Sequence, residues 1–306
     1  MIIRKPNDLP RRPGLPLLAG IASSVCCLLS LNSSPAAAPV AAAVAADSSP
    51  SVEAIAAYTS AQQYVAGKEV AKDDKKALEL FQKASDLGHP DATASVGYFY
   101  SVGMVVEKDE VKARQLFEAA AVQGSALGKV KFARYLIVGT AGAKDINRGI
   151  EILQGMADQG SKTATTMLGE VFFWGEHGDN TPDYARAFPF FKRLADSGDA
   201  NAQNYVGVMI RDQRMEGYPP DSAREWFLRA AQQGNGKACN NLGQWKYESA
   251  DRAERIEALK WILVGKQLKD VTAAFFLESR TAFIKDDEMK EAWASAEETI
   301  AALDKK

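Results

Sequence analysis

Apolar side chains recur at helical spacing over most of the chain, in segments that short polar stretches separate. Residues 76–81 and 111–117 show this pattern clearly. Each segment carries an alanine followed four residues later by a phenylalanine, and this spacing places both side chains on one face of an α-helix. The same pair recurs at Ala77 and Phe81, Ala113 and Phe117, Ala187 and Phe191, and Ala223 and Phe227. The pattern therefore predicts an all-α protein in which equivalent helices bury equivalent faces.

Three series of residues recur in one register with a period of 36 residues. The first series consists of Gly88, Gly124, Gly160, Gly198 and Gly234. The second consists of Gly67, Gly103, Gly139 and Gly175. The third consists of Asp73, Asp109, Asp145 and Asp183. The first and third series each contain one spacing of 38, whereas the second has none. The two additional residues must therefore lie in one loop, between Gly175 and Asp183.

Each series has a physical role at a helix end. An aspartate before an apolar segment is typical of an N-cap, where its carboxylate accepts hydrogen bonds from the first backbone N–H groups. The first glycine series follows the same segments and is typical of a left-handed C-cap. A further small residue recurs inside the other helix of each unit, at Gly97, Ala133, Gly169, Gly207 and Gly243. Because glycine inside a helix costs about 1 kcal/mol relative to alanine, this register predicts a close approach of two helices.

The register divides the chain into six units of two helices each: residues 53–88, 89–124, 125–160, 161–198, 199–234 and 235–269. Unit three departs from the pattern at Gly149 and Leu153, where alanine and an aromatic residue stand elsewhere. Unit five has residues 217–220, Gly-Tyr-Pro-Pro, in place of the second-series glycine, so its loop should differ in shape. Unit six is degenerate and has no glycine near position 270.

Residues 271–303 are expected to form a closing pair of helices. In the last helix, Glu288 falls on the polar face of the helical pattern and Trp293 on the apolar face. An open stack of repeats needs a terminal unit with a soluble outer face. The pattern thus predicts that residues 271–306 cap a solenoid that spans residues 53–270.

Residues 1–46 have the pattern of an export signal rather than that of a folded domain. A basic start is followed by an apolar run over residues 15–31 and an Ala/Pro/Ser-rich stretch, which continues as a linker through residues 47–52. Small residues suit cleavage between positions 36 and 46. The sequence leaves open a twin-arginine signal at Arg11 and Arg12, a lipidated Cys26 or Cys27, and an uncleaved anchor over residues 15–31. We therefore expect an exported protein, periplasmic or secreted, that contacts a membrane only if this segment is retained.

The charge argues against a nucleic-acid-binding protein, and the cysteine content argues against an intrachain disulfide. The net charge of −2 combines +3 over residues 1–46 with −5 over the remainder. An acidic body lacks the clustered positive charge that nucleic-acid backbones require. Of the three cysteines, Cys26 and Cys27 lie in the leader, so its removal leaves Cys239 as a packed residue with no intrachain partner.

No motif of catalytic or metal-binding chemistry stands out. The two histidines are His89, expected to be exposed at a turn, and His177, in an acidic loop without the oxygen-ligand spacing of a calcium site. The sequence contains no H-E-x-x-H pair, no G-x-S-x-G elbow, no S-x-x-K and no phosphate-binding loop. We therefore predict a non-catalytic protein without cofactor or metal.

The repeat resembles a known one. The matching residues are Gly88, Ala92, Val96, Gly97, Tyr100, Gly103, Asp109, Ala113, Phe117, Ala120 and Gly124. At these spacings they resemble the Sel-one-like repeat, a relative of the tetratricopeptide repeat, and the resemblance extends over about residues 53–270. It implies a right-handed α-solenoid of stacked antiparallel helix pairs and an adaptor that assembles protein complexes, as exported bacterial members do in the cell envelope. One cysteine-rich subgroup is linked to β-lactam binding or hydrolysis, but it carries a disulfide in each unit, and Cys239 stands alone.

The resemblance also implies where a partner would bind, because the first helices of tetratricopeptide units line a concave face. The candidate partner-binding residues in that register are Tyr98, Arg134, Glu170, Asn204, Arg211, Asn240, Gln244 and Tyr247. The same register also contains Thr166, Phe173 and Val208. Asn204 and Asn240 share one position in neighbouring units, and two such amides can hold the backbone of an extended peptide. The alternative is that both are solvated surface residues.

The predicted function is that of a protein-interaction scaffold of the cell envelope, with a protein or peptide as partner. Two alternatives remain open on the sequence: a hydrolase directed at the cell wall or at β-lactams, and a secreted factor that interacts with a host.

Overall fold

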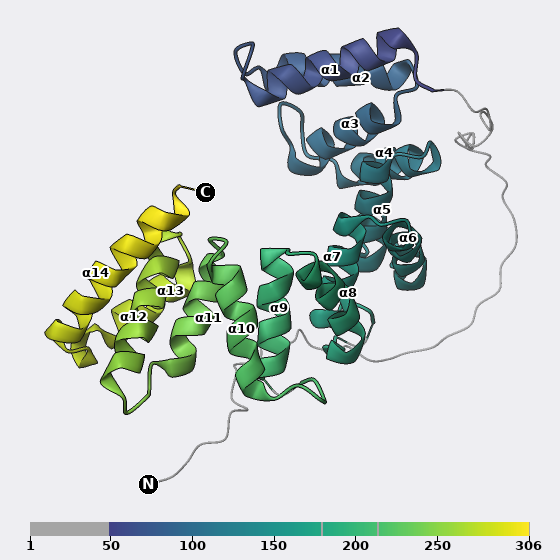
Figure 1. Cartoon of the computed structure of the whole chain (residues 1–306). Helices are drawn as coiled ribbons and strands as arrows, with labels where there is room; N and C mark the ends of the chain where they lie inside the picture. Colours follow the sequence, from purple (N-terminus) through teal and green to yellow (C-terminus); the bar gives the residue numbers. More distant parts are fainter. Residues whose placement is uncertain (1–48, 179, 213, 306) are drawn as a thin grey trace, which may run out of the picture. The chain divides into compact units, whose positions relative to one another are not determined.

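The computed structural model describes residues 49–178, 180–212 and 214–305. The predicted leader, residues 1–46, lies outside these residues. The described chain contains fourteen α-helices, two short 3₁₀ helices and no strand (Figure 1). The first seven helices are α1 (Val52–Ala66), α2 (Asp74–Asp86), α3 (Pro90–Val102), α4 (Glu110–Val122), α5 (Ala126–Val138), α6 (Ile146–Asp158) and α7 (Lys162–Phe173). They are followed by α8 (Tyr184–Asp196), α9 (Ala200–Arg211), η1 (Pro220–Ser222), α10 (Ala223–Ala231), α11 (Gly236–Lys246), α12 (Arg252–Gln267), α13 (Val271–Arg280), η2 (Thr281–Phe283) and α14 (Asp286–Leu303).

The first twelve helices form six pairs, from α1 with α2 to α11 with α12, and each pair falls within one predicted unit. From α1 to α13, each helix packs against the next one along the chain, and the first helices of some neighbouring pairs also touch, as α3 and α5 do. Contacts thus run from unit to unit along the stack, as in other repeat proteins. The described chain is the all-α repeat solenoid that the register predicts.

The aspartate series caps the second helix of the first four pairs, as expected. Each side chain accepts a hydrogen bond from the backbone N–H three residues later, at 2.9 to 3.1 Å. Each backbone N–H in turn donates to a carbonyl of the preceding helix. For Asp73, Asp109 and Asp145 that carbonyl lies nine residues earlier, and for Asp183 it belongs to Phe172, eleven residues earlier. The loop before α8 therefore holds the two additional residues while its anchor points stay the same.

The first glycine series adopts the left-handed conformation, with φ between 80° and 95°. The residue after each glycine then caps the next helix with its own side chain. These capping residues are His89, Ser125, Ser161, Asp199 and Asn235. The expectation that His89 is exposed is wrong: its ring is buried and stacks on Tyr58 at 4.2 Å, because Nδ1 is needed to accept from the N–H of Ala92.

The sixth pair ends in the same turn without a glycine. Lys269 takes the left-handed conformation, with φ of 63°, and the N–H of Asp270 donates to the carbonyl of Gly265 at 3.0 Å. Asp270 then caps α13 by accepting from the N–H of Ala273 at 2.8 Å. Backbone geometry thus continues the repeat through a unit whose sequence has lost its glycine.

The small-residue register does mark a close approach of two helices. A Cβ on Gly97, Gly169 or Gly207 would lie 2.6 to 3.0 Å from the phenylalanine ring of the second helix in the same pair. Unit three reverses the arrangement, because Ala133 occupies the small position and Gly149 faces it. A Cβ on Gly149 would lie 2.9 Å from the carbonyl oxygen of Ala133.

The fifth pair has a different loop, as its sequence predicts. The 3₁₀ helix η1 replaces the first turn of the second helix, and α10 has nine residues with no side-chain cap at Ser222. Elsewhere in the stack, the second helix has thirteen residues and an aspartate cap in each of the first four pairs.

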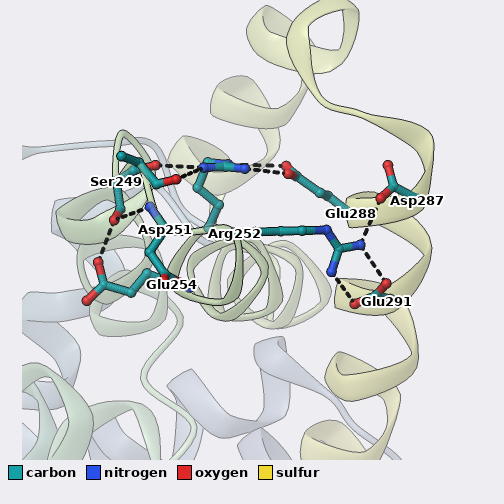
Figure 2. A network of polar contacts seen from close by, with 9 residues as sticks. Ser249, Asp251, Arg252, Glu254, Asp287, Glu288 and Glu291 are labelled. Carbon is teal, nitrogen blue, oxygen red and sulfur yellow. Dashed lines mark hydrogen bonds and ion pairs between the residues drawn. The ribbon is translucent and has the colours of Figure 1, made fainter.

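The two closing helices occupy the predicted residues, but α14 packs chiefly against α12 rather than α13. Figure 2 shows Arg252 of α12 donating to Asp287 and Glu291 of α14. In addition, Arg255 of α12 donates to Glu288 at 2.7 Å. Ala292 and Ala296, on the same face as Glu288, are fully buried. A salt-bridge network and two alanines thus fix α14 on α12.

This arrangement corrects two expectations about the closing helices. Glu288 is buried, with 4% of its surface exposed, because Arg255 supplies its counter-ion, whereas Trp293 is exposed. The exposed residues of α13 are of mixed character: Val271 and Phe275 are apolar, whereas Thr272, Glu278 and Ser279 are polar.

Cys239 is a free, buried cysteine on α11, and burial raises the pKa of its thiol to about 12. It is a packed residue. Among the described helices, none has the length and apolar character needed to cross a membrane.

Candidate functional site

The eight predicted partner-binding residues all lie on first helices or at their ends, from α3 to α11. They differ widely in exposure. Tyr98 and Gln244 are exposed; Arg134, Glu170, Arg211 and Tyr247 are partly exposed; Asn204 and Asn240 are buried, at 7% and 4%. The structure brings two of them, Glu170 and Asn204, into one hollow, together with Thr166, Phe173 and Val208 of the same predicted register.

This hollow, which we call the α7–α9 hollow, has a volume of about 400 Å³. The helix α7 contributes Thr166, Glu170 and Phe173, and Trp174 follows at its end. The helix α9 contributes Asn201, Ala202, Asn204, Tyr205 and Val208, and Asp199 precedes it. Phe191 of α8 and Lys237 of α11 complete the lining. The site is therefore built by two neighbouring first helices, with one residue from the next pair.

Aromatic rings form one wall of the hollow. Tyr205 stacks on Phe191 with ring centroids 4.2 Å apart, and Phe173 meets Tyr205 edge-on at 5.0 Å. Trp174 contacts Phe173 at 4.8 Å but keeps 58% of its surface exposed. Because an exposed tryptophan next to ordered rings is a common anchor point at interfaces, this wall offers stacking area to a partner.

Glu170 is the acidic group of the hollow. Burial raises the pKa of its carboxyl, and this effect is opposed by the nearby charge of Arg134. Arg134 itself is held by Glu176: both guanidinium nitrogens donate to that carboxylate, one of them at 2.9 Å. Among the described residues, none forms a salt bridge with Glu170. The Tyr205 hydroxyl and the charge of Lys237 also favour the charged form of Glu170, so the protein partly stabilises its carboxylate without an ion pair.

The side-chain amides of Asn204 and Asn240, which the sequence suggested could hold a peptide backbone, are already hydrogen-bonded within the protein. Asn204 accepts from Asn241 of the next unit at 2.8 Å, and Asn241 accepts from Arg211 at 3.0 Å. Asn240 donates to Thr272 at 2.8 Å and accepts from Gln244 at 3.0 Å. Both asparagines are thus buried in hydrogen bonds between units, and neither is a solvated surface residue.

The remaining candidates lie apart from the hollow. The ammonium group of Lys131 lies over the ring of Tyr98, 5.5 Å from its centroid. Tyr247 meets Phe276 edge-on at 4.9 Å, so it packs towards α13.

A second hollow, of about 480 Å³, lies between α10, α11 and α12. Several of its polar groups already have partners: Glu254 pairs with Lys246, and the indole N–H of Trp261 donates to Glu257. We therefore take the α7–α9 hollow as the candidate site.

Sequence reasoning did not include several residues of this hollow, among them Trp174, Tyr205 and Lys237. Tyr205 follows Asn204, and on an α-helix adjacent residues point in different directions, so the predicted register did not include it. Trp174 could have been recognised from the sequence. It directly precedes a glycine of the second series, and the residues at the equivalent positions of two other units are Val102 and Val138. Among the residues that the structure describes, no group of three or more His, Cys, Asp or Glu side chains is placed to hold a metal ion.

Comparison with known proteins identifies the repeat. The family model described as Sel1 repeat matches residues 56–89, 90–125, 163–199 and 200–235. The unmatched intervals contain units three and six, the two units whose sequences depart most from the register. No curated protein matches the chain.

Several solved structures are similar to this chain. A Sel1 repeat protein from Oxalobacter formigenes is 24% identical, with a TM-score of 0.62, and the alignment covers 81% of this chain and 99% of that one. A putative Sel1 repeat protein from Klebsiella pneumoniae is 27% identical over 62% of this chain and 92% of that one, with a TM-score of 0.45. A protective antigen of uropathogenic Escherichia coli is 22% identical over 81% of this chain and 61% of that one, with a TM-score of 0.43.

Proposed function

Because the chain is a member of the Sel1-like repeat family, we propose that it is a non-catalytic scaffold that binds a segment of a partner protein in the α7–α9 hollow. Proteins of this family generally mediate protein–protein interactions. The observation that carries the proposal is the combination of an exposed Trp174, an ordered aromatic wall and, without an ion pair among the described residues, Glu170 in one concave site. Concave sites with convergent aromatic and polar groups are where ligands bind most often.

The proposal includes the place of action. The pattern of residues 1–46 supports export, so the partner would be an envelope or secreted protein. This part rests on the sequence pattern alone.

Position-specific photo-crosslinking in the producing cells tests the proposal. A photoreactive phenylalanine analogue at Trp174 should capture a discrete partner. The same analogue at Val122, which is 84% exposed at the end of the second helix α4, serves as the matched control and should capture none. Identical products from both positions, or none from position 174, would contradict the proposal. Circular dichroism of both variants checks that the solenoid stays folded.

A further inference from the structure

The chemistry of the α7–α9 hollow points to one class of ligand group. Its carboxylate, Glu170, is partly exposed and interacts with the Tyr205 hydroxyl, and neither Arg134 nor Lys237 forms a salt bridge with it among the described residues. Arg134 is engaged by Glu176 through two hydrogen bonds, and Lys237 at the start of α11 is exposed to solvent. Asp199 adds a second acid to the lining, although it is occupied as the cap of α9.

The rings beside Glu170 suit a flat cation. Tyr205 and Trp174 lie at the same hollow, and Trp174 is exposed. A guanidinium group stacks on aromatic faces and pairs with a carboxylate through two parallel hydrogen bonds. An ammonium group makes the ion pair as a point charge and gains less from the rings.

The chain itself contains this combination elsewhere. On α10, the guanidinium of Arg229 lies 5.0 Å from the ring centroid of Trp226 and forms a salt bridge with Glu225. The guanidinium of Arg186 likewise lies over Phe172 at 3.9 Å and near Asp183. In the α7–α9 hollow the rings and the carboxylate are present, but among the described residues no arginine or lysine lies over Trp174 or Tyr205, so a ligand would bring that cation.

We propose that the α7–α9 hollow selects its partner by a basic side chain, arginine before lysine, which stacks on Trp174 and Tyr205 and forms an ion pair with Glu170. This inference rests on the proposed function, because it names the group that the scaffold recognises. The occupant is a peptide segment whose positive charge complements the hollow. An uncharged aromatic segment, or an acidic segment held by Lys237, would be a different occupant.

The experiment selects peptides and then measures affinities. A displayed library of random dodecapeptides is selected on the immobilised full chain, and the most enriched peptide is synthesised with a fluorescent label. We expect enrichment of arginine. Replacing that arginine with citrulline, which keeps the shape and removes the charge, should weaken binding at least tenfold. Glu170→Gln should weaken the arginine peptide by a similar factor and leave the citrulline peptide almost unchanged. Glu118→Gln, at an exposed carboxylate of α4, is the matched control and should change neither affinity.

The outcomes separate this inference from the proposed function. Peptides without a preference for basic residues would overturn the basic-side-chain inference, and so would an affinity that Glu170→Gln leaves unchanged. If Trp174→Ala still abolishes binding in either case, the hollow remains a binding site. If no peptide is enriched, or if binding is insensitive to Trp174→Ala, both are overturned. Unchanged melting of the Glu170→Gln variant shows that a lost affinity is not a loss of fold.

Discussion

At the scale of single residues, the solenoid depends on how much space lies between the two helices of a pair. Gly169 leaves room for the ring of Phe191, and Gly207 does the same for Phe227. Unit three carries Ala133 at this position and compensates with the smaller Gly149 and Leu153 on its second helix. The larger side chain on the first helix is therefore balanced by smaller side chains on the second, so that the interface between them stays closely packed.

This spacing predicts opposite effects for the same substitution at two helical glycines. Gly169→Ala should destabilise the protein by about 1 to 3 kcal/mol, because the new Cβ would lie 2.8 Å from Phe191 Cζ and overpacking outweighs the gain in helix propensity. Gly155→Ala, at an exposed position of α6 with no heavy atom within 4 Å, should stabilise it by up to about 1 kcal/mol. Urea unfolding followed by circular dichroism measures both, and shifts of the same sign would contradict the argument.

At the scale of elements, the helices differ in what fixes their N-termini. Every first helix from α3 to α13 begins at a side-chain cap that follows a left-handed residue, so its start is encoded locally. The last helix, α14, has no side-chain cap at Lys285 and begins with three acidic residues. Such residues are favoured near the positive end of the helix dipole. The helix is attached to α12 by the ion pairs with Arg252 and Arg255 together with the buried Ala292 and Ala296.

These ion pairs make the attachment of α14 sensitive to acid. Hydrogen bonds from the two arginines lower the pKa values of Asp287, Glu288 and Glu291. A carboxyl with a lowered pKa in the folded state stabilises that state above its unfolded pKa of about 4, and the contribution is lost as the pH falls through the folded-state pKa. We expect α14 to be protected at pH 7 and to open below about pH 4, before the rest of the solenoid.

Hydrogen exchange of α14, followed by mass spectrometry and corrected for intrinsic rates, checks this expectation. Glu288→Gln removes the charge of the buried carboxyl and should make α14 exchange faster already at pH 7, with a smaller further change in acid. If the variant keeps the protection and pH response of the parent chain, ion pairing does not hold this helix.

At the scale of the whole solenoid, the apolar core is divided unequally. One small cluster contains Ala57, Ala61, Ala77, Phe81, Ala84, Ala92, Val96 and Phe99, and it joins α1, α2 and α3. A second joins α3, α4 and α5. The third extends from Val130 to Ala296 and contains most of the large buried side chains. Since stability in a repeat protein is close to a sum over units and their interfaces, the N-terminal pairs should be the least stable part of the described chain.

This distribution predicts the order of opening under native conditions. Amides of α1 and α2 should exchange fastest among the first twelve helices, because alanine buries little area and, within the described chain, α1 has neighbouring helices on one side only. Amides of α8 to α12 should exchange slowest. Hydrogen exchange at neutral pH measures this order along the chain, and uniform exchange from α1 to α12 would mean that the solenoid opens as one cooperative unit.

The sequence by itself determined the repeat length and the helix boundaries of this protein. The period, the helix ends, the two additional residues before Asp183 and the close approach at Gly169 all follow from interactions within a few residues or from a repeated register. Such interactions require particular residue types at fixed positions, and these residues can be recognised in the sequence without a structure. The repeat in turn predicted which helices would line a binding surface, and five positions of that register line the α7–α9 hollow.

Only the tertiary structure decided which side chains share each interface. Asn204 and Asn240 are buried in pairings with residues more than thirty positions away, Tyr205 joins Glu170 across two units, and α14 lies on α12. A periodic sequence predicts that neighbouring units touch, but each such contact depends on the direction and length of two side chains from different helices. Those distances exist only once the units are stacked, and for this reason the candidate site, unlike the fold, had to be found in the structure.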